Sequence, residues 1–100
     1  MRINIVVLLL LLIVLSCSQN QKSESGPKST KVLYSTHCAI CHGDDGKKGL
    51  AGAKILPESD LNLEQRIAII TNGKGQMMPY TGVLSEEEIE AIANYTLSLK

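Results

Sequence analysis

The sequence contains no phenylalanine and no tryptophan, and only three of its 100 residues are tyrosines. A small domain with so few aromatic side chains needs a staple such as a disulfide, a metal or a large apolar cofactor. A surplus of charge is also missing, because ten lysines and arginines balance ten aspartates and glutamates. Without a basic excess or a basic run, nucleic acid is not an expected partner. The length allows one domain and no more.

Long apolar stretches are confined to the start of the chain. After Arg2, the segment from Ile3 to Leu15 is apolar except for Asn4. It is shorter than the about 20 residues that a membrane-spanning helix needs. A basic residue followed by such a stretch is typical of an export signal, and we predict a signal peptide of the lipoprotein type over residues 1–16.

The end of this leader carries a further motif. Val14-Leu15-Ser16-Cys17 resembles a bacterial lipobox, in which the signal peptide is cut before a cysteine that becomes lipidated. Cys17 is therefore the expected lipidation site, and an uncleaved anchor with a chance cysteine is the alternative. Residues 17–27 are polar and read as the lipidated cysteine followed by a flexible spacer. Both interpretations place the folded part, residues 28–100, outside the cytoplasm on a membrane tether, on the periplasmic side or at the cell surface.

The helices are indicated by their capping residues. Asn62 stands three residues before Gln65, and Ser85 stands three residues before Glu88, which is the spacing of reciprocal helix caps. A further helix is expected upstream and extends to His42. No run has the pattern of a strand pair, so the sequence predicts an all-α protein. Its Gly-rich loops are too long for a bare three-helix bundle, and something is expected to fill the space between them.

Chemistry is concentrated in Cys38-Ala39-Ile40-Cys41-His42, the C-x-x-C-H pattern of covalent c-type haem attachment. On one helical turn the two sulfurs lie at a separation that matches the two haem vinyl groups, and each forms a thioether. His42 then faces the iron as the proximal ligand. The cofactor also supplies the large apolar surface that the weak core lacks.

Two other functions of the cysteines would require sequence patterns that this chain does not have. A thioredoxin-type dithiol needs a βαβ unit, and a zinc site needs a second pair of ligands, and neither pattern is present. His37 directly precedes Cys38. We expect His37 to be a solvated surface residue and not a ligand.

Several further segments accompany the attachment motif in order. They are Leu33-Tyr34, Asp45-Gly46, Asn72-Gly73-Lys74-Gly75-Gln76-Met77-Met78-Pro79, and Leu84-Ser85-Glu86-Glu87-Glu88-Ile89 leading to Tyr95. With them, the chain from about residue 28 to residue 100 resembles class I cytochrome c in its small bacterial single-haem form. The resemblance implies three main helices and long loops around one covalently bound haem, and one-electron transfer as the activity.

The resemblance also implies a second iron ligand, the methionine that directly precedes a proline in a late loop. Here this is Met78 before Pro79, with Met77 as the alternative and otherwise a packing residue against the haem. Ligation by histidine and methionine raises the reduction potential relative to two imidazoles. The resemblance further implies that Tyr34 packs against Tyr95 in the last helix.

The sequence departs from the family in one respect that affects the proximal side. A proline whose carbonyl holds the proximal imidazole is often found after the attachment loop, but none stands between His42 and Pro57. We expect a backbone carbonyl near Leu50 to take this role. Three lysines near the motif, Lys47, Lys48 and Lys54, are either a patch that guides a partner or ordinary surface charge.

The sequence therefore predicts a membrane-tethered, monomeric electron carrier with one haem c, and not an enzyme. Its expected partners are redox proteins that dock transiently at the exposed haem edge. A haem-based enzyme or sensor, peroxidase-like or gas-binding, with a labile sixth ligand is the first alternative. The second is a non-redox binding lipoprotein in which the C-x-x-C-H pattern is accidental.

Overall fold

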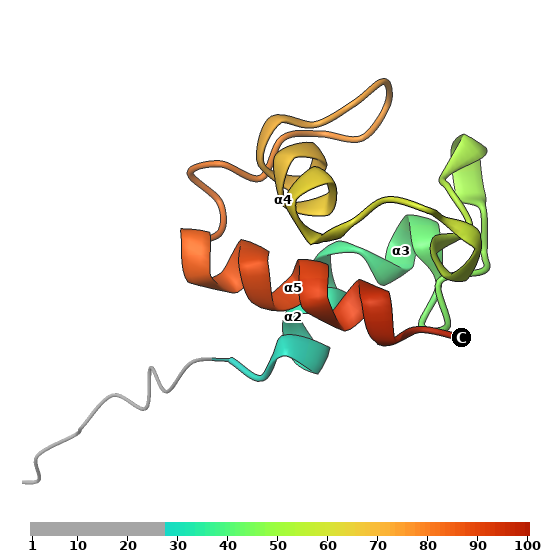
Figure 1. The fold of residues 1–100 in the computed structure, drawn as a ribbon, viewed down its shortest axis with the longest axis horizontal. Helices are drawn as coiled ribbons and strands as arrows, with labels where there is room; N and C mark the ends of the chain where they lie inside the picture. Colours follow the sequence, from blue (N-terminus) through green and yellow to red (C-terminus); the bar gives the residue numbers. More distant parts are fainter. Residues whose placement is uncertain (1–27) are drawn as a thin grey trace, which may run out of the picture.

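A computed structural model describes residues 28–100, and within this range the protein is built from helices and loops (Figure 1). The elements in chain order are α2 (Thr30–His37), α3 (Ala39–His42), the short 3₁₀ turns η2 (Leu50–Gly52) and η3 (Leu56–Glu58), α4 (Leu63–Asn72) and α5 (Glu86–Ser98). The described range contains isolated β-bridges but no strand. The all-α prediction is confirmed. The predicted signal peptide, the lipidated Cys17 and the spacer at 17–27 lie outside the described residues.

Both predicted helix caps are confirmed as reciprocal capping boxes. At the start of α4, Asn62 Oδ1 accepts from the Gln65 amide at 2.9 Å, and Gln65 Oε1 accepts from the Asn62 amide at 3.0 Å. Ser85 and Glu88 repeat the arrangement at the start of α5, with distances of 3.1 and 3.0 Å. The hydrogen bond from the Ser85 amide lowers the pKa of the Glu88 carboxyl. These local contacts set where α4 and α5 begin.

The helix expected to run to His42 is divided in two. Cys38 separates α2 from α3 with φ −113° and ψ −39°. The Cys38 amide donates to Tyr34 O at 2.8 Å and the His42 amide donates to Cys38 O at 2.9 Å, but no backbone bond joins residues 39–41 to residues 35–37. The expected helix therefore reaches His42 as two segments that meet at Cys38.

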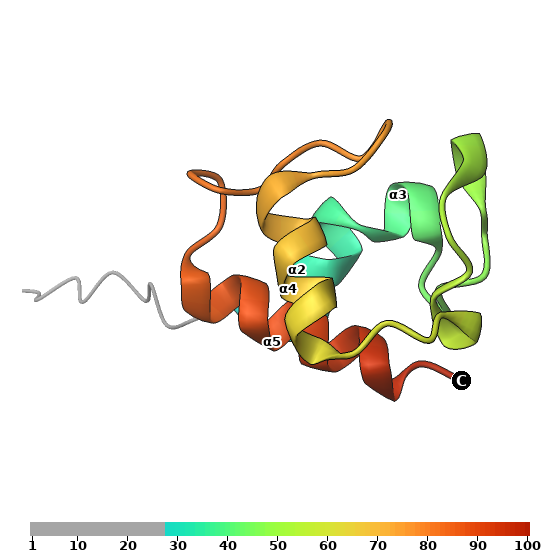
Figure 2. The same ribbon diagram turned by 45° about the horizontal axis from the view of Figure 1, so that its top comes forward.

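The core lies where α5 packs against α2 and α4 (Figures 1 and 2). Tyr34 is almost fully buried there, and its ring lies 4.9 Å from that of Tyr95, which confirms the expected aromatic pair. The Tyr34 hydroxyl donates to Gly43 O at 2.6 Å, and burial is the main cause that raises the pKa of Tyr34 to about 12. This tyrosine thus connects the helix core to the end of α3.

The loops flank the helices at different places. The segment 43–58 lies beside α3, and the loop between α4 and α5 runs beyond the end of α4 (Figure 2). None of the helices in residues 28–100 is long and apolar enough to cross a bilayer.

Candidate functional site

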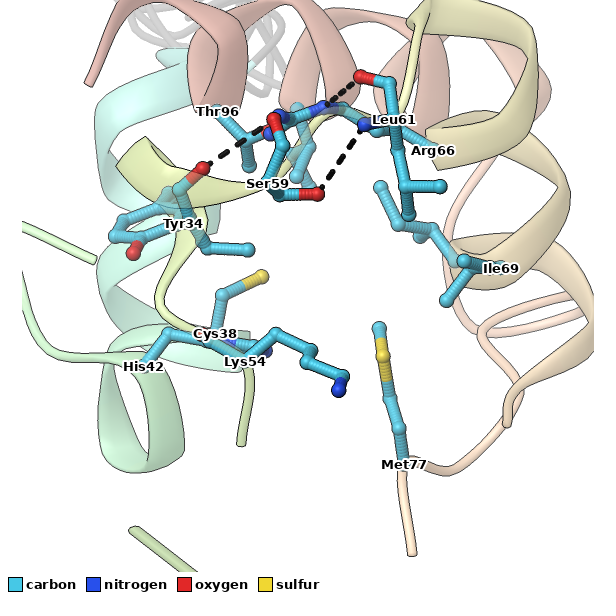
Figure 3. Close-up of a pocket in the computed structure, with 13 residues that line it drawn as sticks. Tyr34, Cys38, His42, Lys54, Ser59, Leu61, Arg66, Ile69, Met77 and Thr96 are labelled. Atoms are coloured by element: carbon cyan, nitrogen blue, oxygen red, sulfur yellow. Dashed lines mark hydrogen bonds between the residues drawn. The ribbon is translucent and has the colours of Figure 1, made fainter. Parts of the chain in front are cut away.

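A pocket opens between the helices and the two long loops (Figure 3). About 90 Å³ of it is accessible to the centre of a water-sized sphere, and its walls are almost entirely apolar. Its lining residues are Tyr34, Cys38, His42, Lys54, Leu56, Ser59, Leu61, Arg66, Ile69, Ile70, Met77, Ile92 and Thr96. The space that the long loops indicated in the sequence is therefore present.

The two attachment cysteines differ in exposure. Cys38 is half-buried and its sulfur points into the pocket, whereas Cys41 is exposed (Figure 3). The two thiols form no disulfide. Burial raises the pKa of the Cys38 thiol to about 11, so this thiol is protonated at neutral pH. Both sulfurs remain available for bonds to a group placed in the pocket.

His42 also lines the pocket, and its ring is oriented by the backbone. Its Nδ1 lies 3.0 Å from Lys54 O. In the neutral imidazole Nδ1–H donates to this carbonyl, which leaves the Nε2 lone pair for a metal. The expectation of a carbonyl near Leu50 was wrong in position. The carbonyl that His42 meets belongs to Lys54, which lies four residues after Leu50 and beyond the turn η2.

The two adjacent methionines are placed in the opposite way to the sequence-based preference. Met77 lines the pocket, and its side chain points into it across from Cys38 and His42 (Figure 3). The Met78 side chain is 53% exposed. A tight turn sets this arrangement, because the Lys74 amide donates to Met77 O and the Met77 amide donates to Lys74 O, each at 3.0 Å. The geometry favours Met77 over Met78 as the residue facing His42.

Gly73 permits the loop to return so closely after α4. Its φ is +73°, and an added Cβ would lie only 2.6 Å from Met77 O. A side chain here would force the turn away from α4, and with it Met77.

Tyr80, which the sequence analysis did not single out, fixes the far end of the methionine loop. Its side chain is 9% exposed, and its hydroxyl donates to His37 O at 2.8 Å. Burial is the main cause that raises the pKa of Tyr80. The Tyr80 ring meets the His37 ring edge-on at 5.8 Å, so His37 is half-buried and not the solvated residue we expected. The loop is thereby tied to the residue before Cys38.

We expect Tyr80→Phe to lower the free energy of unfolding by about 1 kcal/mol, because it removes one buried hydroxyl hydrogen bond. Urea denaturation measures this loss. Tyr34→Phe is the matched control, since it removes the bond to Gly43 O instead. Amide hydrogen exchange should accelerate across residues 74–80 in the Tyr80 variant only. Equal exchange in both variants would contradict a specific role of Tyr80 in holding the loop.

Two charged groups of the pocket remain. Of the three lysines considered in the sequence, Lys54 lines the pocket, and Lys47 and Lys48 do not. Arg66, which the sequence analysis missed, is 7% exposed and also lines it. Arg66 shares the helical face of Leu63 and Ile70, and an arginine on an apolar face is the signal that could have identified it.

Known proteins are similar to this chain over most of its described residues. Residues 26–95 match the family model described as cytochrome C oxidase, cbb3-type, subunit III. Cytochrome c6 of Microcystis aeruginosa is 39% identical over 72 residues, which cover 66% of this chain and 88% of the relative. Cytochrome c6 of Leptolyngbya boryana is 35% identical over 71 residues, which cover 65% of this chain and 82% of the relative.

The family match explains the pocket and the pair of cysteines at the attachment motif. It means that haem c is bound covalently through Cys38 and Cys41. It also means that the protein transfers electrons and is not an enzyme. The chain belongs to the cytochrome c family, as a small class I c-type cytochrome with a single haem.

Proposed function

We propose that the protein is a one-electron carrier whose haem iron is ligated by His42 and Met77. One observation carries this proposal: an oriented imidazole and a thioether line opposite sides of the same apolar pocket (Figure 3). When bound, the haem supplies an iron that takes up and releases one electron. Met77 is preferred to Met78 here because Met77 lines the pocket, whereas the Met78 side chain is 53% exposed.

The residues around the pocket suit electron transfer better than a catalysed reaction at the haem. The bond to Lys54 O fixes the tautomer and the orientation of His42. A thioether is a soft ligand that suits iron in both redox states. Ligands on both sides oppose binding of oxygen or peroxide, and the apolar walls keep water away. These features favour a carrier over a haem enzyme or sensor.

A transient redox partner is the proposed recipient or donor of the electron. Ile40, between the two attachment cysteines, is 63% exposed, and Met78 follows the proposed ligand directly. Exposed apolar side chains next to the haem-binding residues suit a small, short-lived contact, which in electron-transfer encounters buries less than about 1,200 Å².

The experiment uses the full chain, produced in a bacterium that matures c-type haem. We expect covalent haem, a reversible titration with the slope of one electron, and no change of the ferrous spectrum under carbon monoxide. Rapid binding of carbon monoxide or peroxide by the resting protein would favour the haem-based enzyme or sensor. Absence of covalent haem would favour a non-redox binding lipoprotein.

We further propose that Cys17 carries a lipid and keeps the carrier on the outer side of a membrane. The lipobox-like Val14-Leu15-Ser16 before Cys17 and the polar residues after it support this. A tether raises the effective concentration of the carrier near its partners. Mass spectrometry of the protein purified from membranes should find a mature chain that begins at Cys17 and carries acyl chains. A chain that keeps residues 1–16 would indicate an uncleaved anchor instead.

A further inference from the structure

Arg66 is a buried cation whose hydrogen bonds all go to neutral oxygens. Nε donates to Leu61 O at 2.9 Å, and Nη1 donates to Thr96 Oγ1 at 3.0 Å. Nη2 donates to Ser59 O at 3.0 Å and makes a longer contact of 3.5 Å with Leu56 O. Every guanidinium nitrogen thus has a partner, but the two N–H groups of Nη1 have only one acceptor between them. Within residues 28–100, no carboxylate accepts from this side chain.

The positive charge of Arg66 has no negatively charged partner among residues 28–100. An arginine stays protonated in proteins, although burial lowers the pKa of Arg66. A buried charge is costly unless an opposite charge accompanies it. The hydrogen bonds to neutral oxygens satisfy the donors but leave the positive charge of the guanidinium unbalanced. An anion is therefore expected on the side of Arg66 that faces the pocket.

Three polar side chains of the pocket lie together on one side. Figure 3 shows Ser59, Arg66 and Thr96 close to one another, whereas Lys54 lies near Cys38 on the other side. Haem has the same asymmetry, because its two vinyl-derived edges join the cysteines and its two propionate carboxylates lie at the opposite edge. A haem attached at Cys38 thus turns its carboxylates towards the polar side.

We propose that Arg66 binds a haem propionate carboxylate and balances its charge inside the protein. This rests on the proposed function, in that a haem c occupies the pocket. The planar guanidinium can present its remaining Nη1–H to a carboxylate and exchange the long contact with Leu56 O for a second bond. Thr96 and Ser59 hold the guanidinium in place and act as positioning residues. The positive charge also favours the reduced haem, which carries one positive charge less than the oxidised form.

The test compares Arg66→Gln with Arg66→Lys in the full haem-bearing protein. Resonance Raman spectroscopy follows the propionate-bending vibration, and spectroelectrochemistry follows the reduction potential. We expect both variants to shift the vibration, because neither retains the planar fork. Arg66→Gln should shift the redox equilibrium towards the oxidised form about tenfold, which equals about 59 mV for one electron. Arg66→Lys keeps the charge and should shift the potential much less.

Ile67→Val is the control for simple loss of packing. Ile67 lies next to Arg66 on α4 and is partly buried against the core, but it does not line the pocket. This variant should lower thermal stability and leave the vibration and the potential unchanged. The proposal is overturned if Arg66→Gln and Arg66→Lys lose stability with an unmoved vibration, since Arg66 would then only tie the 56–61 segment to α4 and α5. A wild-type chain without covalent haem would overturn both this proposal and the proposed function.

Discussion

Met77→Ala is expected to remove the weak far-red band of methionine-ligated ferric haem and to lower the reduction potential. The potential should fall by an amount on the order of 100 mV, since axial ligands set haem potentials over a range of about 0.8 V. The physical reason is the loss of a soft thioether that stabilises the ferrous state. The measurements are absorption spectra of the oxidised protein and a spectroelectrochemical titration.

Met78→Ala is the matched control, because it truncates the same side-chain type one residue away. Its side chain is largely solvated, so the band and the potential should stay close to those of the wild type. The ferrous Met77→Ala protein should also bind carbon monoxide, and the Met78→Ala protein should not. If the band disappears in the Met78 variant and persists in the Met77 variant, the assignment drawn from the methionine–proline pattern is the right one.

Which of the two methionines faces the pocket is a question that the sequence alone does not decide. The pattern of a methionine before Pro79 favoured Met78, but which side chain faces the pocket depends on backbone geometry. The turn at Lys74–Met77 and the bond from Tyr80 to His37 O set that geometry. The bond from Tyr80 to His37 O joins residues 43 positions apart, and no local sequence pattern predicts it.

Local signals predicted the elements that local physics determines. The caps at Asn62 and Ser85 are formed by side chains three residues from their partners, and both were found from spacing alone. The carbonyl that orients His42 had no such signal, because every residue has a carbonyl and only the path of the chain selects Lys54. The cysteine and histidine ligand candidates were predictable since covalent attachment requires these residue types at this spacing.

Removal of both thioethers has the largest expected effect on the fold. We expect Cys38→Ala/Cys41→Ala to lose its helical circular dichroism at room temperature when produced without covalent haem. The buried core is small, and Tyr34, Ile70 and Ile92 belong both to the core and to the pocket wall. Without a group in the pocket, these side chains lose the apolar contacts that a haem would add to them. A domain of this size rarely gains more than about 3–5 kcal/mol from its own core, so little stability remains.

The single variants Cys38→Ala and Cys41→Ala separate the effect of covalent haem attachment from that of haem packing in the pocket. Each variant keeps one thioether and should remain folded with reduced thermal stability. Cys38→Ala should lose more than Cys41→Ala, because the Cys38 sulfur lies inside the pocket and Cys41 is exposed. Far-UV circular dichroism and thermal melting measure these effects, and acid-acetone extraction shows whether any remaining haem is covalent. A double variant that unfolds cooperatively at the wild-type temperature without any haem would mean that the polypeptide core is sufficient by itself. The fold would then provide a ready-made pocket, and haem would contribute only the redox chemistry.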